Sequence, residues 1–537
     1  MTPVEKRVAE DVVEKPFIKR ASKNVRKYKA KKVDATAPLG VLEFEINELA
    51  KDNDLTNDMI SNDMKLILND ESVLPIYHRE VEDVEILKLT SNGDGLGIIP
   101  HPQDITKKQI VIVPFGLPGD VVTIRVFKSH PSYVESDLLS IQKSSEYRDD
   151  SLINCKYFGK CSGCQYQNIS YDQQLEFKRK VIENAYKFFA KEISDKLPEV
   201  DKTEPSPLQY NYRTKLTPHF NLPNSIKNGK PLDFLPPLGF AAKGRPQWRS
   251  TEGGDNSILD IEECSIGTPI INKGMANERL KYQKTIKNYK KGATILLREN
   301  TRLDNEESIN DINPEKESVD EKGDVTIHKQ DGHIKTCATN SRYIVNEIID
   351  NKNFKFSAGE FFQNNNSILP AVTNYVKSNL SLSNEKPNYL IDAYCGSGLF
   401  SITCSSNVEK VIGVEVSADS VKFAKLNADA NNIQNSEFIV GKAEKIFQNI
   451  DLPSSQTSII LDPPRKGCDD VFLNQLSDFN PAKIIYISCN VHSQARDLQW
   501  FLNNTANGHL YKVDSIKGFD FFPQTHHVES VAVLSLK

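Results

Sequence analysis

The last third of the chain alternates short apolar runs with helix-like segments. The apolar runs predict buried strands at residues 389–393, 411–415, 436–441, 458–462 and 484–488. Such alternation is typical of parallel strands joined by right-handed crossovers. We therefore predict that residues 346–537 form an α/β domain with a Rossmann-like sheet. Ligands of such sheets bind beyond the carboxyl ends of the strands, so the loops at these ends should converge on one crevice.

Two of these loops predict a binding site for a methyl donor. In the turn GSGLF, Gly396 and Gly398 allow a ligand close to the backbone, and Glu415 ends the next strand. An acid there can accept hydrogen bonds from both ribose hydroxyls. A nicotinamide cofactor is the alternative, but the third glycine of the dinucleotide fingerprint is absent. Asp462 is followed by two prolines, which lack backbone donors and suit a planar substrate. These features favour S-adenosylmethionine and a class I methyltransferase domain.

A third loop carries a candidate nucleophile. The run at 484–488 ends in Cys489, and a polar helix start follows it. Buried structural cysteines are common, but a helix N-terminus favours a thiolate at this position. Carbon 5 of uracil is a poor nucleophile, and addition of a thiolate to carbon 6 enables it to attack a methyl group. We therefore expect Cys489 to act in pyrimidine methylation, with the pyrimidine flipped out of its RNA.

The last strand offers a base for the proton on carbon 5. This proton must leave before the cysteine can be eliminated. In FFPQTHHVESVAVL, Glu529 opens an otherwise apolar strand, and a surface carboxylate is the alternative interpretation. His526 and His527 precede it and compete for the role, and His527 suits it by residue type. We predict Glu529 as the base.

The remainder of the chain divides into three parts. Residues 1–77 are first basic and then acidic without a core periodicity, which predicts a disordered charged tail. Short apolar stretches with glycine between them predict a small β-barrel over residues 78–143. Residues 144–345 suggest a strand-rich middle domain, and its charged stretch 304–331 suggests an inserted surface loop.

Four cysteines of the middle domain form a candidate metal site. Cys155, Cys161 and Cys164 fall within ten positions, and Cys264 lies in a similar polar, turn-like context. Four thiolates can hold either zinc or an iron–sulfur cluster, and the spacing does not decide between them. Free thiols are the alternative.

Composition excludes some classes of protein. The net charge of −5 argues against wholesale coating by nucleic acid. No apolar run reaches the roughly 18 residues of a membrane span, and a secretory signal is absent. Nine scattered cysteines argue against a disulfide framework. We expect a soluble, intracellular, monomeric protein without a membrane partner.

These motifs resemble those of RNA 5-methyluridine methyltransferases, especially the eukaryotic tRNA (uracil-5-)-methyltransferases, over residues 81–537. The resemblance implies tRNA as partner, its T-loop uridine (position 54) as target, Cys489 as nucleophile and Glu529 as base. It also implies that S-adenosylmethionine is bound by Gln363 in FFQNN, Tyr394 in DAYCGSG, Glu415 in GVEVS and Asp462 in LDPPRKG.

The resemblance bears on the other domains as well. It implies that the barrel is a TRAM domain, and that Cys155, Cys161, Cys164 and Cys264 hold a [4Fe-4S] cluster. Val491 departs from the family pattern, since many relatives have proline after SCN, and we expect only a small change in loop rigidity. Two alternatives remain: a ribosomal RNA methyltransferase with the same chemistry, and a non-catalytic protein that binds or folds tRNA.

Overall fold

The computed structural model describes most of the chain. The described residues are 26–29, 32–222, 232, 234–245, 257–303, 318–319, 326–330, 333–380, 389–441, 446–447 and 450–537. Among them, none of the helices combines the length and the apolar character needed to cross a bilayer.

A closed barrel follows the N-terminal segment, as predicted. Its five strands are β1 (Glu80–Leu89), β2 (Asp94–Pro100), β3 (Lys108–Pro114), β4 (Val121–Ser129) and β5 (Val134–Lys143). They close in the order β1-β2-β3-β5-β4. Alternate side chains such as Val84, Val111 and Ile124 point inward and form its core.

The segment before the barrel is folded where we predicted a disordered tail. Its helices are α1 (Pro38–Asp52), α2 (Met64–Asn69) and α3 (Leu74–Tyr77). Leu42, Ile46 and Leu49 form a stripe at helical spacing on α1, and this stripe packs on the barrel residues Leu96 and Ile110. The prediction was therefore wrong for residues 34–77, because burial of this stripe stabilises a helix that its acidic composition concealed. Residues 1–25 lie outside the described ranges.

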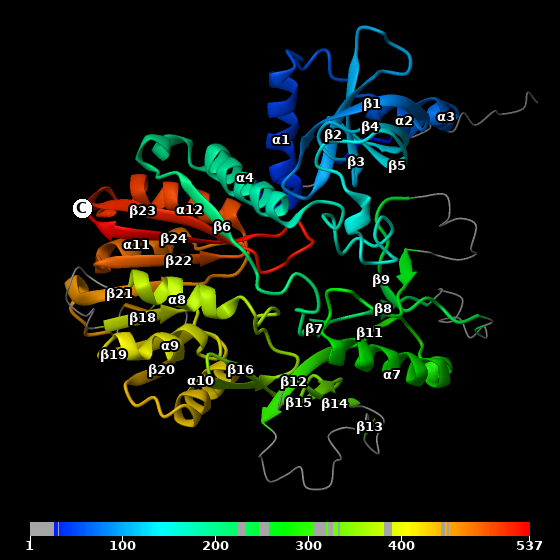
Figure 1. Cartoon of the computed structure of the whole chain (residues 1–537). Coiled ribbons are helices and arrows are strands. Elements are labelled where there is room, and N and C mark those ends of the chain that lie inside the picture. The colour runs from blue at the N-terminus through cyan, green and yellow to red at the C-terminus, as the bar shows by residue number, and fades with distance from the viewer. Residues whose placement is uncertain are drawn as a thin grey trace, which may run out of the picture.

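The largest sheet has eight strands in the order β20-β19-β18-β21-β22-β24-β23-β6 (Figure 1). All of its strands run parallel except β24, which is antiparallel to β22 and β23. This arrangement confirms the predicted Rossmann-like fold. The strands are β6 (Val200–Glu204), β18 (Tyr389–Ala393), β19 (Lys410–Glu415), β20 (Ser436–Val440), β21 (Thr457–Leu461), β22 (Lys483–Ser488), β23 (Tyr511–Phe519) and β24 (Glu529–Leu536).

Helices cover both faces of this sheet. Residues of α8 (Leu369–Asn379), α9 (Leu399–Cys404) and α10 (Ala418–Ala430) share one apolar cluster with its strands. Residues of α4 (Tyr171–Phe189), α11 (Asp470–Phe479) and α12 (Val491–Asn504) share the other. Strand β6 thus belongs to the methyltransferase sheet, and α4 covers one face of that sheet. We had assigned both elements to a middle domain of residues 144–345. Val181, Ile182 and Ala185 form an apolar stripe on α4, and burial of this stripe against α12 accounts for the difference.

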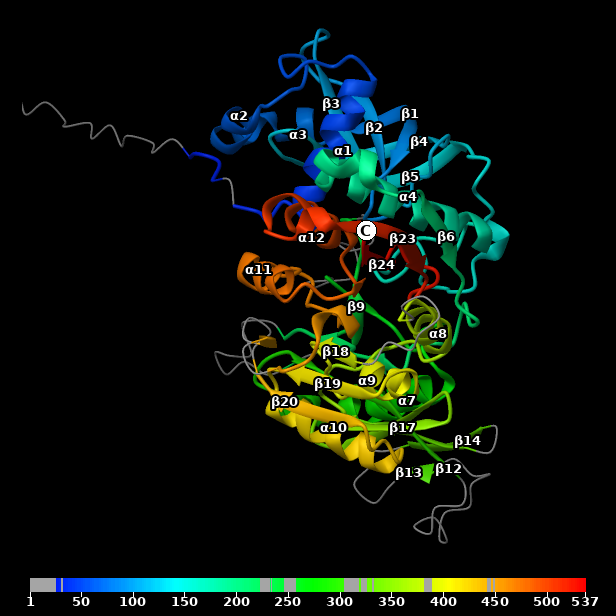
Figure 2. The same cartoon turned by 90° about the vertical axis from the view of Figure 1, so that its left-hand side faces the viewer.

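The middle of the chain forms small antiparallel sheets beside the methyltransferase domain (Figures 1 and 2). Two strands, β13 (Ser318–Val319) and β14 (Thr326–Gln330), lie inside the charged stretch 304–331. The insertion is therefore partly strand rather than loop, and its other residues are outside the described ranges. The remaining elements are β7 (Lys215–Leu216), β8 (His219–Phe220), β9 (Gly239–Ala241), β10 (Ile258–Asp260), α7 (Pro269–Thr285), β11 (Ala293–Thr294), β12 (Leu297–Leu303), β15 (His333–Ala338), β16 (Ile344–Ile349) and β17 (Lys352–Ser357).

A buried ion pair joins α4 to the segment that connects β23 and β24. Lys178 Nζ lies 2.5 Å from Asp520 Oδ1 and donates to the carbonyl of Phe522 at 3.0 Å. Both charged side chains are fully buried. Burial lowers the pKa of Lys178, and Asp520 opposes this shift. Removal of one partner would leave the other charge buried without its counterion.

We predict that Lys178→Met lowers the free energy of unfolding by about 3–5 kcal/mol, because the Asp520 carboxylate loses its buried partner. Urea unfolding measures the change. Lys180→Met removes an exposed lysine from the same helix and is the matched control. Equal stability of the two variants would contradict a structural role for the pair.

Candidate active site

Three loops at the carboxyl edge of the sheet bring the predicted residues together. Cys489 follows β22, Asp462 follows β21, and Glu529 opens the antiparallel strand β24. Ser488 and Ser530 are direct partners across β22 and β24. Since Cys489 follows Ser488 and Glu529 precedes Ser530, this register sets the thiol and the carboxyl side by side. The effect of Glu529 on the pKa of Cys489 agrees with this placement.

The turn after β18 has the backbone geometry of a ligand cradle. Tyr394 and Gly396 have φ angles of 65° and 54°, and a Cβ atom on Gly396 would meet no atom within 4 Å. The Glu415 carboxylate accepts from the N–H of Gly396 at 3.2 Å and from the N–H of Ser417 at 2.9 Å. The open side of the turn and the adjacent carboxylate fit the nucleoside part of S-adenosylmethionine.

Two neighbouring carboxyls, Asp392 and Asp462, have raised pKa values. Desolvation, together with nearby Asp392, raises the pKa of Asp462 to about 7. Burial likewise raises the pKa of Asp392 to about 7, although Ser401 donates a hydrogen bond to it at 2.6 Å. Each carboxyl is thus partly neutral near pH 7, which limits the repulsion between them.

Gln363 lies on the loop between β17 and α8 and is buried. The residues beside it attach this loop to two parts of the molecule. Arg298 Nη1 donates to Asn364 Oδ1 at 3.0 Å, and Asn365 Nδ2 donates to the carbonyl of Phe521 at 3.1 Å. The loop is therefore held between β12 and the segment that leads into β24.

The thiol of Cys489 is less acidic than its position at a helix start predicts. Helix α12 begins two residues later, as expected, and Asn490 caps it by accepting from the N–H of His492 at 3.2 Å. However, desolvation of the thiol inside the site, followed by Glu529 and Asp462, raises the pKa of Cys489 to about 11, although the residue as a whole is exposed. In the protein without substrate these effects, desolvation above all, oppose the thiolate that the helix start favours.

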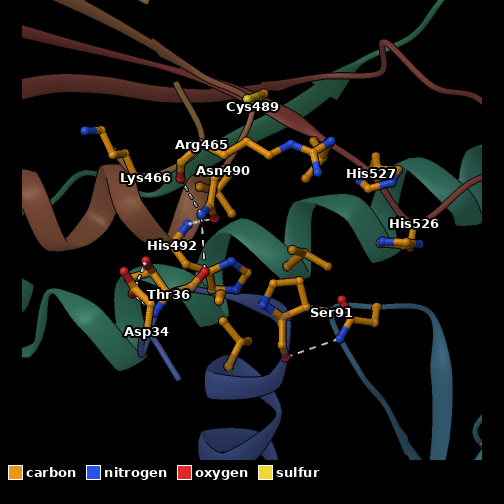
Figure 3. Close-up of a pocket in the computed structure, with 17 residues that line it drawn as sticks. Asp34, Thr36, Ser91, Arg465, Lys466, Cys489, Asn490, His492, His526 and His527 are labelled. Carbon is orange, nitrogen blue, oxygen red and sulfur yellow. Dashed lines mark hydrogen bonds between the residues drawn. The ribbon is translucent and has the colours of Figure 1, made fainter. Parts of the chain in front are cut away.

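Arg465 is a residue of this site that we did not predict. Its side chain extends below Cys489 toward His527 (Figure 3). It opposes the rise in the pKa of both Cys489 and Glu529. A signal was present in the sequence, since Arg465 directly follows the two prolines of LDPPRKG. Its guanidinium can stabilise negative charge on the sulfur or on a bound ring.

The side chains proposed as bases differ strongly in proton affinity. Burial, together with Asp462, raises the pKa of Glu529 to about 8. Desolvation, together with Arg465, lowers the pKa of His527 to about 4, although the residue as a whole is exposed. Nδ1 of the His526 ring lies 2.9 Å from Gln165 Oε1. Glu529, once ionised, is the strongest base of the three.

A pocket of about 300 Å³ opens beside the thiol (Figure 3). Cys489, Arg465 and His527 line it from the methyltransferase domain. Its opposite wall comes from the barrel and from the segment before it, including Ser91 and Thr36. The site is thus shared between the N-terminal part of the chain and the sheet.

The four cysteines of the middle domain gather around one another. Burial, together with Cys264 and Cys155, raises the pKa of Cys161 to about 11. The pKa of Cys164 is also raised, by burial and then by Cys264. In the part of the chain that the structure describes, however, no group of three or more His, Cys, Asp or Glu side chains is arranged to hold a metal ion. The predicted metal site is not confirmed.

The sheet order, the glycine turn and the acid that ends β19 define a class I methyltransferase that uses S-adenosylmethionine. Two family models match the chain: "tRNA (Uracil-5-)-methyltransferase" over residues 335–537 and "TRAM domain" over residues 75–139. The chain is 57% identical over 531 residues to the tRNA (uracil(54)-C(5))-methyltransferase of Saccharomyces cerevisiae, covering 95% of this chain and 83% of that protein. It belongs to the tRNA (uracil-5-)-methyltransferase family.

A second relative agrees with this assignment, and a solved structure has the same fold. The tRNA (uracil(54)-C(5))-methyltransferase of Schizosaccharomyces pombe is 41% identical, covering 96% of this chain and 87% of that protein. The crystal structure of Pyrococcus abyssi tRNA (uracil-54, C5)-methyltransferase with S-adenosyl-L-homocysteine has a TM-score of 0.57 and 22% identity, covering 84% of this chain and 100% of that chain. This structural likeness confirms the predicted fold, and the family model confirms the TRAM barrel.

We predict that Glu529→Gln stabilises the protein increasingly as the pH rises from 4.5 to 8. The folded-state pKa of about 8 exceeds the ordinary value of 4.5. The contribution of Glu529 is therefore fully present below pH 4.5 and is lost as the pH rises through 8. The difference in free energy of unfolding should grow by at most about 1.4 kcal/mol per pH unit.

Urea unfolding of wild type and variant at several pH values measures this difference. Glu43→Gln, an exposed position on α1, is the control. Parallel stability curves for wild type and Glu529→Gln would show that Glu529 is solvated.

Proposed function

We propose that this enzyme methylates carbon 5 of uridine 54 in tRNA through a transient bond between Cys489 and carbon 6. The observation that carries the proposal is the register that sets Cys489 beside Glu529. The target base is supported by the relatives, which are named for uracil 54 of tRNA. The TRAM barrel beside the pocket supports an RNA substrate.

The donor site would be formed by Gln363, Tyr394, Glu415 and Asp462. Glu415 would bind the ribose hydroxyls, and the open turn at Gly396 would lie against the nucleoside. The methyl group on the sulfonium of S-adenosylmethionine is the electrophile that carbon 5 attacks.

The residues around the thiol have distinct roles in this reaction. The deprotonated sulfur of Cys489 adds to carbon 6, and the ring becomes an enolate with nucleophilic carbon 5. Arg465 would stabilise the negative charge, since its guanidinium already opposes the rise in the pKa of the thiol. After methyl transfer, the Glu529 carboxylate takes the proton from carbon 5. The carbon–sulfur bond then breaks, and the double bond between carbons 5 and 6 returns.

Glu529 suits the base role better than His527. A group with a pKa of about 8 binds a proton far more strongly than a group with a pKa of about 4. The high pKa also means that Glu529 must ionise before each proton transfer. Arg465 favours its ionised form.

We predict that the purified protein forms 5-methyluridine at position 54 of a tRNA transcript and that Cys489→Ala abolishes this product. Mass spectrometry of the digested RNA measures it. Cys404→Ala, which changes a buried thiol of α9, should retain activity. Methylation of ribosomal RNA with unmodified tRNA would contradict the substrate, and an active Cys489→Ala variant would contradict the nucleophile.

The same assay distinguishes the base. Glu529→Gln should accumulate a covalent complex with methylated tRNA, because the carbon 5 proton is not removed and the cysteine cannot leave. A shifted band on a denaturing gel reports this complex. Normal turnover in this variant, together with a trapped complex in His527→Gln, would assign the base to His527.

We also propose that Cys155, Cys161, Cys164 and Cys264 hold a [4Fe-4S] cluster. The proposal is supported by the proximity of these thiols, since Cys264 and Cys155 contribute to the raised pKa of Cys161 and of Cys164, and Cys155 contributes to that of Cys264. The N–H of Gly163 donates to Cys161 Sγ at 3.4 Å, and backbone donors also reach Cys264. Donors of this kind favour the thiolate form that ligation requires.

We predict about four irons per chain and an absorbance band near 400 nm after anaerobic purification. Cys164→Ser should lose both, whereas Cys337→Ser, in β15 outside the group, should retain them. A colourless protein that contains zinc would show that the four cysteines form a zinc site and not a cluster site. A protein free of both metals would leave four structural thiols.

A further inference from the structure

The segment of residues 34–41 reaches the active site from outside both family-model matches. Those matches cover residues 75–139 and 335–537. Asp34, Thr36, Pro38 and Val41 nevertheless line the pocket beside Cys489 (Figure 3). The N-terminal segment therefore forms a wall of the site in which the thiol lies.

Thr36 is the residue of this segment that contacts the catalytic loops directly. It is 3% exposed. Its carbonyl accepts from Asn490 Nδ2 at 3.2 Å, and its Oγ1 lies 3.1 Å from Ser493 Oγ. Arg496 Nη1 also donates to this Oγ1, at 3.5 Å. One threonine thus meets three side chains at the start of α12.

These contacts lead to both loops that carry the reacting groups. Asn490 directly follows Cys489, and its Nδ2 also donates to the carbonyl of Arg465 at 2.9 Å. Ser493 Oγ lies 2.9 Å from that carbonyl. Thr36 is therefore joined through one shared set of hydrogen bonds to the backbone beside the thiol and to the backbone that carries the guanidinium.

The position of Thr36 is itself fixed from two sides. Asp34 Oδ1 accepts from the N–H and from the hydroxyl of Thr36, both at 2.9 Å.

Farther along α1, the buried Glu45 accepts from the N–H of Ser91 at 2.7 Å and from its hydroxyl at 2.6 Å. Glu48 pairs with Lys88 of β1 and Lys187 of α4. The segment is held on the barrel and on α4 before it meets the catalytic loops.

We propose that Thr36 is a positioning residue of the methyl transfer reaction, which holds the Cys489 and Arg465 loops in their reactive arrangement. The proposal rests on the proposed role of Cys489. It requires no contact between Thr36 and the uridine. Loss of the hydroxyl should leave tRNA binding intact and allow the thiol and the guanidinium to move apart. Such a loss lowers kcat more than it raises KM.

The test compares Thr36→Val with Thr36→Ser in the full-length enzyme. Valine keeps the shape but removes the hydroxyl, and serine restores it. We expect kcat for tRNA methylation to fall about tenfold in Thr36→Val, with KM changed less than twofold, and to recover in Thr36→Ser. The rate of covalent complex formation with tRNA containing 5-fluorouridine should fall by the same factor.

Thr106→Val is the matched control. Asp104 and Thr106 make the same pair of hydrogen bonds as Asp34 and Thr36, but Thr106 is exposed on the barrel. This variant should keep wild-type kinetics. Urea unfolding confirms that each variant is folded. Should Thr36→Val unfold, Asp34→Asn, which weakens the hold on the same hydroxyl, is expected to give the same selective fall in kcat.

The outcomes separate this proposal from the proposed function. A folded Thr36→Val enzyme with unchanged kcat, or with a change in KM alone, overturns the role of Thr36. An active Cys489→Ala enzyme overturns the nucleophile instead. If Cys489→Ala is inactive and Thr36→Val has normal kcat, only the positioning role fails.

Discussion

The antiparallel pairing of β24 with β22 determines where chemistry can occur in this protein. If β24 shifted by one residue, the carboxyl of Glu529 would move to the other face of the sheet, because side chains alternate along a strand. Eight residues of the β22–β24 register, including Ile485 and Val533, are buried in apolar clusters that hold this register in place. The placement of the reacting groups is therefore determined by buried apolar residues of the sheet.

Burial also determines the proton chemistry of the site. Asp392, Asp462 and Glu529 lie in surroundings that penalise ionisation, and each keeps its proton to a higher pH than in water. Arg465 acts in the opposite direction on Glu529 and on the thiol of Cys489. The site therefore sets these three carboxyls with raised pKa values against the guanidinium of Arg465. A bound nucleobase that changed this balance would change which group is ionised.

The sequence predicted features that depend on local pattern. Glycine turns, the two prolines after Asp462 and the apolar runs identified the sheet and its loops, because each of these acts within a few residues. It did not predict α1, whose buried Glu45 accepts two hydrogen bonds from the distant Ser91. The pKa of Cys489 was likewise hidden, since the carboxyls that raise it come from two other strands.

Strand β6 completes the methyltransferase sheet by pairing with a segment that is distant in the sequence. It pairs with β23, and the paired residues Val200 and Ile516 are 316 positions apart along the chain. The edge of the sheet formed by β23 and β6 can assemble only after the C-terminal part has left the ribosome, although β6 is synthesised early. Until then Val181, Ile182 and Ala185 of α4 lack the C-terminal side chains on which they pack. Folding of this enzyme should therefore be completed after translation, in a step that also unites its N-terminal segment with the nucleophile loop.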